Sequence, residues 1–282
     1  MSRIGVSIVI PTLGNRENYL REAIESIRYQ KCELKEILVV KARKFSSHSM
    51  EIDCSDVRFI GGAHTLNPSE ARNLGVKYSK YEVISFLDDD DWWGSNYLES
   101  VMKCFQEFNC DIVISSLTTS EGRKFDSIES AIESPEILYY QNPGLTGSNI
   151  SILKSAFNLL DGFNPNLSTS HDKALIIEAT KKRFKIALNE SGNAYHRKHN
   201  GERASDQSRI LRGYEEFYAA YSNEMNYFQS LNNVVRIKKL RWTETKSLLP
   251  LFLYIFYSSK LKVISVLKKS ERFRRKCIRY TE

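Results

Sequence analysis

The stretch EVISFLDDDDWWGSNYL, residues 82–98, joins an apolar run to four consecutive carboxylates. Its first six residues are mostly apolar, β-branched or aromatic, which is typical of a buried strand. The acidic residues 88–91 begin where that strand ends, in a chain whose formal net charge is +7. Ligands of open α/β sheets bind beyond the carboxyl ends of the strands. The stretch therefore indicates a binding site at a strand end.

Further strand-like runs alternate with helical periodicity over the first 200 residues. The predicted strands are GVSIVI (5–10), EILVV (36–40), EVISFL (82–87), DIVIS (111–115), SNISILK (148–154) and FKIAL (184–188). Helices are expected between them, one of them over about residues 95–108. This order predicts βαβ units and an α/β fold, with a mostly parallel central sheet flanked by helices.

One helix start carries a complete capping signal. Asn67 is a good N-cap residue, Pro68 fits the first helical position, and Glu70 is spaced to close a capping box. A second helix is expected from about His171, in HDKALIIEATKKR. From about residue 206 no strand pattern remains. We therefore expect an α/β domain over residues 1–205 and a helical extension over 206–282.

Composition is that of an ordinary soluble protein, with 41% hydrophobic and 27% charged residues. The N-terminal MSRIGVSIVIPTLGN does not resemble a signal peptide, because Pro11 and Gly14 interrupt a short apolar run. Five cysteines without a CxxC pair favour reduced thiols over a disulfide framework or a zinc site. We expect a cytoplasmic protein.

The C-terminal part combines apolar and basic residues. The window SLLPLFLYIFYSS (247–259) is shorter than the ~20 residues of a spanning helix and contains Pro250. The following SSKLKVISVLKKSERFRRKCIRY (258–280) is rich in Lys and Arg. A basic amphipathic segment favours peripheral contact with an anionic membrane. A helix packed on the domain and a dimer contact are the alternatives, and no motif indicates nucleic acid.

Two interpretations of the acidic run remain open from spacing alone. Adjacent carboxylates repel, and a hard cation such as Mg²⁺ or Mn²⁺ would compensate them. Alternate residues of an extended segment point the same way, so Asp88 and Asp90 could share one cation. The alternative is a solvated acidic turn that favours the start of the next helix.

An ordered series of motifs resembles the family 2 glycosyltransferases, which are nucleotide-sugar enzymes with the GT-A fold. The resemblance covers roughly residues 5–200, and its order and spacing are more specific than any single piece. The motifs are VSIVIPT (6–12), LREAIESIRYQ (20–30), EILVV (36–40), SEARNLGVKYSKYEVISFLDDDDWW (69–93) and TGSNISILKSAFNLLDGFNPNLSTSHDKAL (146–175).

The resemblance implies roles for several carboxylates. Asp88 and Asp90 would form the family's Asp-x-Asp element: both hold Mg²⁺ or Mn²⁺, and Asp88 also contacts the donor nucleotide. Asp172 matches the aspartate that takes the proton from the acceptor hydroxyl. His171 stands where the family usually has Glu. Without the resemblance, Asp172 reads as an ordinary residue in the first turn of a helix.

The resemblance also implies a donor site. Thr12 and Arg72 match positions that contact the base and ribose, and Arg197 and His199 lie in a basic segment that closes over the diphosphate. A solvated basic loop, and a surface arginine paired with an acid, are the alternatives for these residues. Lys41 stands where the family usually has an Asp that binds the nucleobase or ribose. A cation accepts no hydrogen bonds, so nucleotide recognition must differ.

The resemblance implies a metal-dependent, inverting transfer of a sugar from a nucleotide-sugar donor. Among such donors it favours a UDP-sugar. The acceptor would be a hydroxyl of a saccharide, carried on lipid, in the synthesis of lipopolysaccharide, O-antigen or capsule at the cytoplasmic face of the inner membrane. Another metal-dependent nucleotidyl or phosphate transferase is one alternative. A non-catalytic nucleotide-sugar-binding homologue, suggested by Lys41, is the other.

Overall fold

The computed structural model describes residues 5–41, 55–61, 65–125, 128–198 and 207–279, with side chains as far as residue 265. The chain forms two compact units. The first comprises Met1–Asn166 with His171–Asn200, and the second comprises Leu167–Ser170 with Gly201–Glu282.

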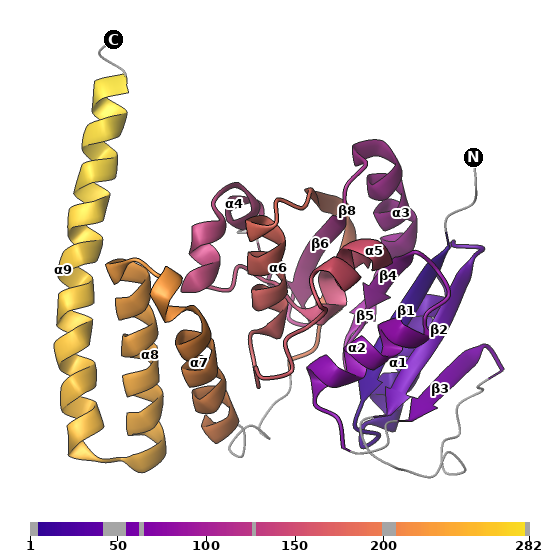
Figure 1. The fold of residues 1–282 in the computed structure, drawn as a ribbon, viewed down its shortest axis with the longest axis horizontal. Coiled ribbons are helices and arrows are strands. Elements are labelled where there is room, and N and C mark those ends of the chain that lie inside the picture. The colour runs from indigo at the N-terminus through magenta and orange to yellow at the C-terminus, as the bar shows by residue number, and fades with distance from the viewer. Residues whose placement is uncertain (1–4, 42–54, 62–64, 126–127, 199–206, 280–282) are drawn as a thin grey trace. The chain divides into compact units, whose positions relative to one another are not determined.

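The first unit is built on one eight-stranded sheet with the order β3-β2-β1-β4-β7-β6-β8-β5 (Figure 1). β1 pairs in parallel with β2 and β4, β2 with β3, and β6 with β8. The remaining pairs, β4–β7, β6–β7 and β5–β8, are antiparallel. The strands are β1 Val6–Thr12, β2 Lys35–Lys41, β3 Val57–Gly61, β4 Val83–Phe86, β5 Trp92–Trp93, β6 Ile112–Thr119, β7 Ile150–Leu153 and β8 Ile186–His196.

The central strands are covered on both faces. Every residue from Val6 to Ile10 in β1 is buried, and so is every residue of β4. Successive strand residues point to opposite faces, so both faces of the sheet carry packed side chains. Phe86 of β4 contacts Phe157 and Phe163, with ring centroids 5.7 and 5.1 Å away. The predicted α/β fold with a mostly parallel, doubly covered sheet is confirmed.

The helices of the first unit fall between these strands, as the alternation predicted. They are α1 Glu17–Arg28, α2 Pro68–Tyr78, α3 Tyr97–Phe108, α4 Ile128–Glu133, α5 Lys154–Leu159 and α6 His171–Lys181, with 3₁₀ turns η2 Pro135–Tyr139 and η3 Gly147–Asn149. At α2 the predicted capping box is present: the Glu70 N–H donates to Asn67 (3.0 Å), and the Asn67 N–H donates to Glu70 (2.7 Å).

Two strands were not predicted from the sequence. β3 is only five residues long, and two of its residues are exposed, so its apolar pattern is weak. β5 is a two-residue strand that pairs with β8 through Trp92 and Trp93. Neither has the length or alternation by which a strand is recognised in sequence.

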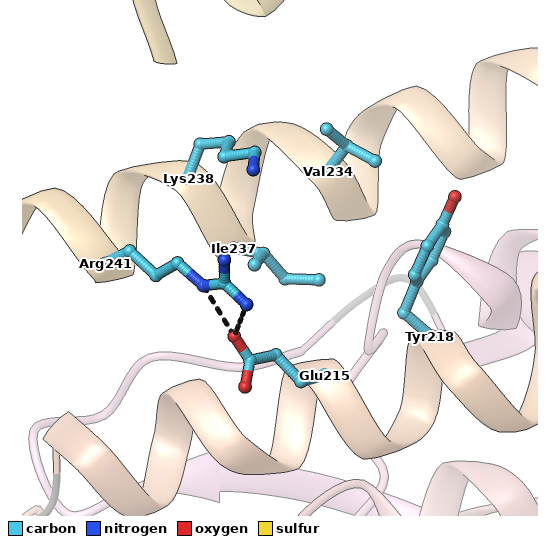
Figure 2. A pocket seen from close by; sticks show the side chains of 6 residues that line it. All are labelled: Glu215, Tyr218, Val234, Ile237, Lys238 and Arg241. Atoms are coloured by element: carbon cyan, nitrogen blue, oxygen red, sulfur yellow. Dashed lines mark hydrogen bonds and ion pairs between the residues drawn. The ribbon is translucent and has the colours of Figure 1, made fainter. Parts of the chain in front are cut away.

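From Gln207 onward the second unit is helical, with α7 Gln207–Tyr221, η5 Ser222–Glu224, α8 Tyr227–Thr245 and α9 Leu248–Arg279. α8 and α9 lie side by side and are joined by a short turn. Trp242 of α8 stacks on Tyr254 of α9, with centroids 6.2 Å apart. Residues of α7 and α8 line a cavity of about 320 Å³. Figure 2 shows the side chains that line it, among them Arg241, whose Nε donates to Glu215 (2.7 Å).

α9 differs from the sequence expectation at its start. Pro250 does not interrupt the helix, because it lies in the first turn, where the missing N–H has no intrahelical partner to lose. Among the described helices, α9 contains one stretch, Leu248–Ser265, that is long and apolar enough by composition to cross a membrane. Its mean hydropathy is 1.3.

We expect Gly75→Ala to destabilise the first unit by about 1–3 kcal/mol, because a Cβ at Gly75 would lie 2.3 Å from Val9 Cγ1 and 3.1 Å from Val40 Cγ2. This cost should exceed the gain in helix propensity. Urea unfolding measures it. Gly61→Ala, where a Cβ meets nothing within 4 Å, is the control. Equal stability of the two variants would contradict the packing of α2 on β1 and β2.

Candidate functional site

The candidate site lies at the carboxyl ends of β1, β2 and β4. Thr12, the last residue of β1, is paired in register with Lys41, the last residue of β2. Val9 of β1 pairs with Phe86, the last residue of β4. The acidic run leaves β4 at this same edge, so residues 88–91 come next to Thr12.

The acidic run is a turn, and the expectation of an extended segment is wrong. The Asp91 N–H donates to the Asp88 carbonyl (3.1 Å), which closes a four-residue turn. The four carboxylates therefore separate, which lowers their mutual repulsion. Each meets a different partner: Asp88 pairs with Arg72, Asp89 with Thr12, Asp90 with Arg16 and Asp91 with Ser148.

Asp89 is held by the end of β1. The Thr12 hydroxyl donates to Asp89 (2.5 Å), and the Gly14 N–H donates to the Thr12 hydroxyl (3.0 Å). Burial raises the pKa of Asp89 to about 6, against the Thr12 hydrogen bond, which lowers it. Thr12, predicted as a nucleotide contact, is thus committed to the acidic turn in this structure.

Asp91 is the anchor of the turn and is fully buried. It accepts hydrogen bonds from the Ser148 hydroxyl (2.5 Å) and the Arg197 N–H (2.9 Å), and lies 3.1 Å from His196 Nδ1. The hydrogen bond to Asp91 raises the pKa of His196, against burial, which lowers it. Burial raises the pKa of Asp91 itself. One carboxylate therefore ties together the ends of β4 and β8 and the turn η3.

Arg72 of α2 is buried, with 3% of the residue exposed. Its guanidinium pairs with Asp88 through one nitrogen, and Nη1 lies 2.9 Å from His171 Nε2. A guanidinium only donates, so His171 Nε2 accepts as a neutral imidazole. Gly147 permits this arrangement, because a Cβ there would lie 2.7 Å from Arg72 Nη2. The alternative of a surface position for Arg72 is excluded, although the arginine does pair with an acid, Asp88.

Asp172 lies in the first turn of α6, with 15% of its side chain exposed. Its Oδ2 is 3.6 Å from His171 Nε2. Burial raises the pKa of Asp172 to about 7; the charge of Arg72 lowers it and that of Asp88 raises it further. The fold therefore gathers Asp88, from the end of β4, and Asp172, from α6, around one buried arginine.

Arg197 is engaged on several sides. Its Nε donates to the Asp90 carbonyl (3.0 Å), and its Nη2 pairs with Glu22. The guanidinium lies 4.4 Å from the Tyr19 ring centroid and 4.7 Å from that of Trp92. Arg197 thus lies at the acidic turn and is held there by protein groups. The predicted site residue His199 lies outside the described residues.

Lys41 is the departure noted in the sequence, and the structure places it beside Thr12. Its residue is 9% exposed, and its ammonium lies 4.6 Å from the Phe59 ring centroid. A buried cation therefore lies at the carboxyl edge of the sheet. β1 stands between its strand, β2, and β4, the strand that the acidic turn follows.

A sequence model described as "Glycosyl transferase family 2" matches residues 7–160, which is more than half of the chain. The chain belongs to glycosyl transferase family 2. The resemblance of the sequence motifs to this family is confirmed.

Three curated relatives are similar over less than half of this chain. An uncharacterized glycosyltransferase of Rickettsia bellii is 35% identical over 44% of this chain and 19% of the relative. Minor teichoic acid biosynthesis protein GgaB of Bacillus subtilis is 35% identical over 42% of this chain and 14% of its own length. Glycosyltransferase GlyA of Streptococcus pneumoniae is 30% identical over 42% of this chain and 18% of its own length. The match thus spans less than a fifth of each relative.

Solved structures share the fold at low identity. Residues 1–349 of S. aureus TarS in complex with UDP-GlcNAc align with a TM-score of 0.58 and 15% identity, over 84% of this chain and 81% of that one. The same fragment in complex with UDP aligns with a TM-score of 0.58 and 14% identity, over 92% of this chain and 91% of that one. The curled, mostly parallel sheet with flanking helices is the GT-A fold expected from the motifs.

The carboxylates of the acidic turn suit a cation only as a partial ligand set. Among the described residues, no group of three or more His, Cys, Asp or Glu side chains could hold a metal ion. The side chains of Asp88 and Asp90 are 29% and 16% exposed, and each faces one arginine. Mg²⁺ needs only one or two protein carboxylates when substrate phosphates complete its shell. The turn therefore fits a cation that arrives with a diphosphate.

Sequence reasoning missed three participants of the site. Arg16, which pairs with Asp90, follows β1 in a loop and carries no motif of its own. Ser148, which donates to Asp91, lies within a quoted family motif but was not singled out as a site residue. His196 belonged to the basic stretch that contains Arg197, but only the fold shows that it faces the buried Asp91.

We expect Asp172→Asn to raise the free energy of unfolding at pH 8 by about 1–3 kcal/mol. The folded carboxyl has a pKa of about 7 because of burial, against 3.8 for an ordinary one, so the parent chain loses stability as the pH rises from 4 through 7. The advantage of the variant should be greatest above pH 7 and vanish toward pH 4.

Urea unfolding between pH 4 and 8 measures this difference. Asp161→Asn, at an exposed position, is the matched control. A gain in Asp172→Asn that is independent of pH, or a loss at pH 8, would contradict a carboxylate held in this buried place.

Proposed function

We propose that the chain is a metal-dependent, inverting glycosyltransferase that moves a sugar from a nucleoside-diphosphate donor to a hydroxyl of a saccharide acceptor. The observation that carries the proposal is the convergence of Asp88 and Asp172 on Arg72 at the carboxyl edge of the sheet. One carboxylate comes from the acidic turn and the other from α6. This arrangement supports transfer from a donor bound at the acidic turn to an acceptor near α6.

Asp172 is the proposed general base. Its pKa of about 7 suits proton transfer at neutral pH, since a general base works best when its pKa is near the pH of the solution. The acceptor O–H gives its proton to the Asp172 carboxylate as the oxygen bonds to the anomeric carbon. The bond from that carbon to the diphosphate oxygen breaks, and the nucleoside diphosphate leaves. One displacement of this kind inverts the anomeric centre.

Asp88 and Asp90 are the proposed ligands of Mg²⁺ or Mn²⁺. A bound cation would neutralise the charge that develops on the leaving diphosphate. Arg72 and Arg16 hold the two carboxylates in position. Asp91, the last residue of the turn, fixes the turn in place because its carboxylate accepts hydrogen bonds from the Ser148 hydroxyl and the Arg197 N–H.

Arg197 is the proposed phosphate contact, together with His199. The pair of Arg197 with Glu22 is open to exchange, because the Glu22 side chain is 52% exposed and exposed ion pairs add little stability. A phosphate oxygen would take the place of Glu22, since a guanidinium binds phosphate readily. Arg197 would keep its bond to the Asp90 carbonyl.

Family membership and the UDP complexes of S. aureus TarS support a nucleotide-sugar donor, and UDP-sugars are the first to test. The Thr12 hydroxyl is hydrogen-bonded to Asp89, and Lys41 carries a positive charge where the family usually has an Asp. Recognition of the base and ribose would therefore rest on Arg72 and the acidic turn. GgaB, by its name a minor teichoic acid biosynthesis protein, supports a cell-surface saccharide acceptor, which we propose is carried on lipid.

We expect Asp172→Asn to reduce sugar transfer by about 100- to 10,000-fold while donor affinity changes by less than about threefold. UDP release from UDP-GlcNAc, UDP-Glc and UDP-Gal, with Mn²⁺ and added saccharides, measures turnover, and thermal shift measures donor binding. Asp90→Asn should instead lose the Mn²⁺-dependent shift, and Asp161→Asn should change neither. Undiminished turnover in Asp172→Asn would contradict its role as base.

A further inference from the structure

α9 carries an apolar stripe on the side away from α8. The exposed side chains at helical spacing are Leu248, Leu249, Phe252, Ile255, Phe256 and Val263. Their exposed fractions range from 45 to 81%. None of the window Leu248–Ser265 is buried. A run of large apolar side chains of this length is unusual on a surface that faces only water.

The stripe has a basic residue on each edge. At 3.6 residues per turn, Lys260 falls on one side of the stripe and Lys262 on the other. Both are exposed, and the Lys260 ammonium lies 4.4 Å from the Phe256 ring centroid. Lysines at the borders of an apolar face place their stems along the apolar surface and their charges at the headgroups.

The charge of the chain is concentrated in this region. Residues 246–282 contain ten Lys and Arg and two Glu, a formal net charge of +8, while the whole chain has +7. The rest of the chain is therefore nearly neutral. A basic segment attached to an apolar stripe complements an anionic lipid surface.

We propose that α9 binds in the plane of an anionic membrane, with the stripe facing the acyl chains and the lysines at the headgroups. This inference goes beyond the proposed transfer reaction and does not depend on it. It gives the chain a lipid surface as partner and names the residues that contact it.

A spanning helix fits this surface less well. α9 lies beside α8, and Trp242 stacks on Tyr254 in that contact. α8 carries exposed Lys239 and Arg241. Taking α9 across the bilayer would either draw these charges into hydrocarbon or break the α8 contact, and both are costly.

A second copy of the chain is a poorer occupant than lipid. A twofold dimer brings the same patch of both copies together. The stripe would then face itself, with Lys260, Lys262 and the rest of the +8 segment of one copy near those of the other. Like charges repel across such a contact, whereas anionic headgroups attract both edges of the stripe.

The test is flotation of the full chain with phosphatidylcholine vesicles, with and without about 30 mol% phosphatidylglycerol. We expect binding to the anionic vesicles at least tenfold tighter than to neutral ones, weakening as salt is raised. Phe252→Gln/Phe256→Gln and Lys260→Gln/Lys262→Gln should each weaken it about tenfold or more. Leu159→Gln, and Lys77→Gln/Lys103→Gln, exposed on the first unit, are the matched controls.

Depth measurements distinguish an in-plane helix from a spanning one. Leu249→Trp and Val263→Trp are compared by quenching with brominated lipids, as differences from the unsubstituted chain. An in-plane helix gives the two positions similar depths, whereas a spanning helix separates them by about 20 Å. Unequal depths of that size would overturn the in-plane arrangement.

Two further results would overturn the proposal. One is equal binding to neutral and anionic vesicles, or binding that the stripe variants leave intact. The other is absence of vesicle binding together with a dimer, seen by sedimentation velocity, that Phe252→Gln/Phe256→Gln dissociates. Asp172→Asn should bind vesicles like the parent chain, so failure of the membrane proposal and failure of the proposed chemistry are told apart.

Discussion

The site depends on one buried positive charge. Arg72 lies among Asp88, His171 and Asp172, and without its guanidinium two carboxylates would share a desolvated space with no cation between them. Burial acts to lower the pKa of Arg72, but Asp88 and Asp172 outweigh it and keep the pKa raised. The arginine therefore stays charged, and its two terminal nitrogens hold Asp88 and His171, the neighbour of Asp172.

The acidic run shows how a dense negative cluster becomes tolerable. The turn sends its carboxylates to Arg72, Thr12, Arg16 and Ser148, and each partner comes from a different element of the fold. Only Asp88 and Asp90 remain both charge-paired and partly exposed, while Asp89 and Asp91 have raised pKa values because they are buried. Four identical residues in a row thus differ in exposure, partner and pKa because each has different surroundings.

Local signals in the sequence predicted the main strands, the capping box at Asn67 and the family, because strand-like runs, caps and ordered motifs are encoded by neighbouring residues. The turn formed by the acidic run, the short strands β3 and β5, and the partners of Asp91 and Arg72 were not predicted. Each depends on contacts between distant segments: His171 stands 99 residues from Arg72, and His196 stands 105 from Asp91. Such pairings follow from the assembled sheet and not from spacing.

The account stands most directly on the electrostatic effect of Arg72 on the proposed base. A ¹³C NMR titration of the Asp172 carboxyl in the parent chain, in Arg72→Lys and in Arg72→Gln measures it. We predict a pKa of about 7 in the parent, a similar value in Arg72→Lys, and a clear rise in Arg72→Gln, where the charge that lowers the pKa is lost. An Asp172 that titrates near 3.8 in the folded parent, or identically in all three chains, would contradict the account.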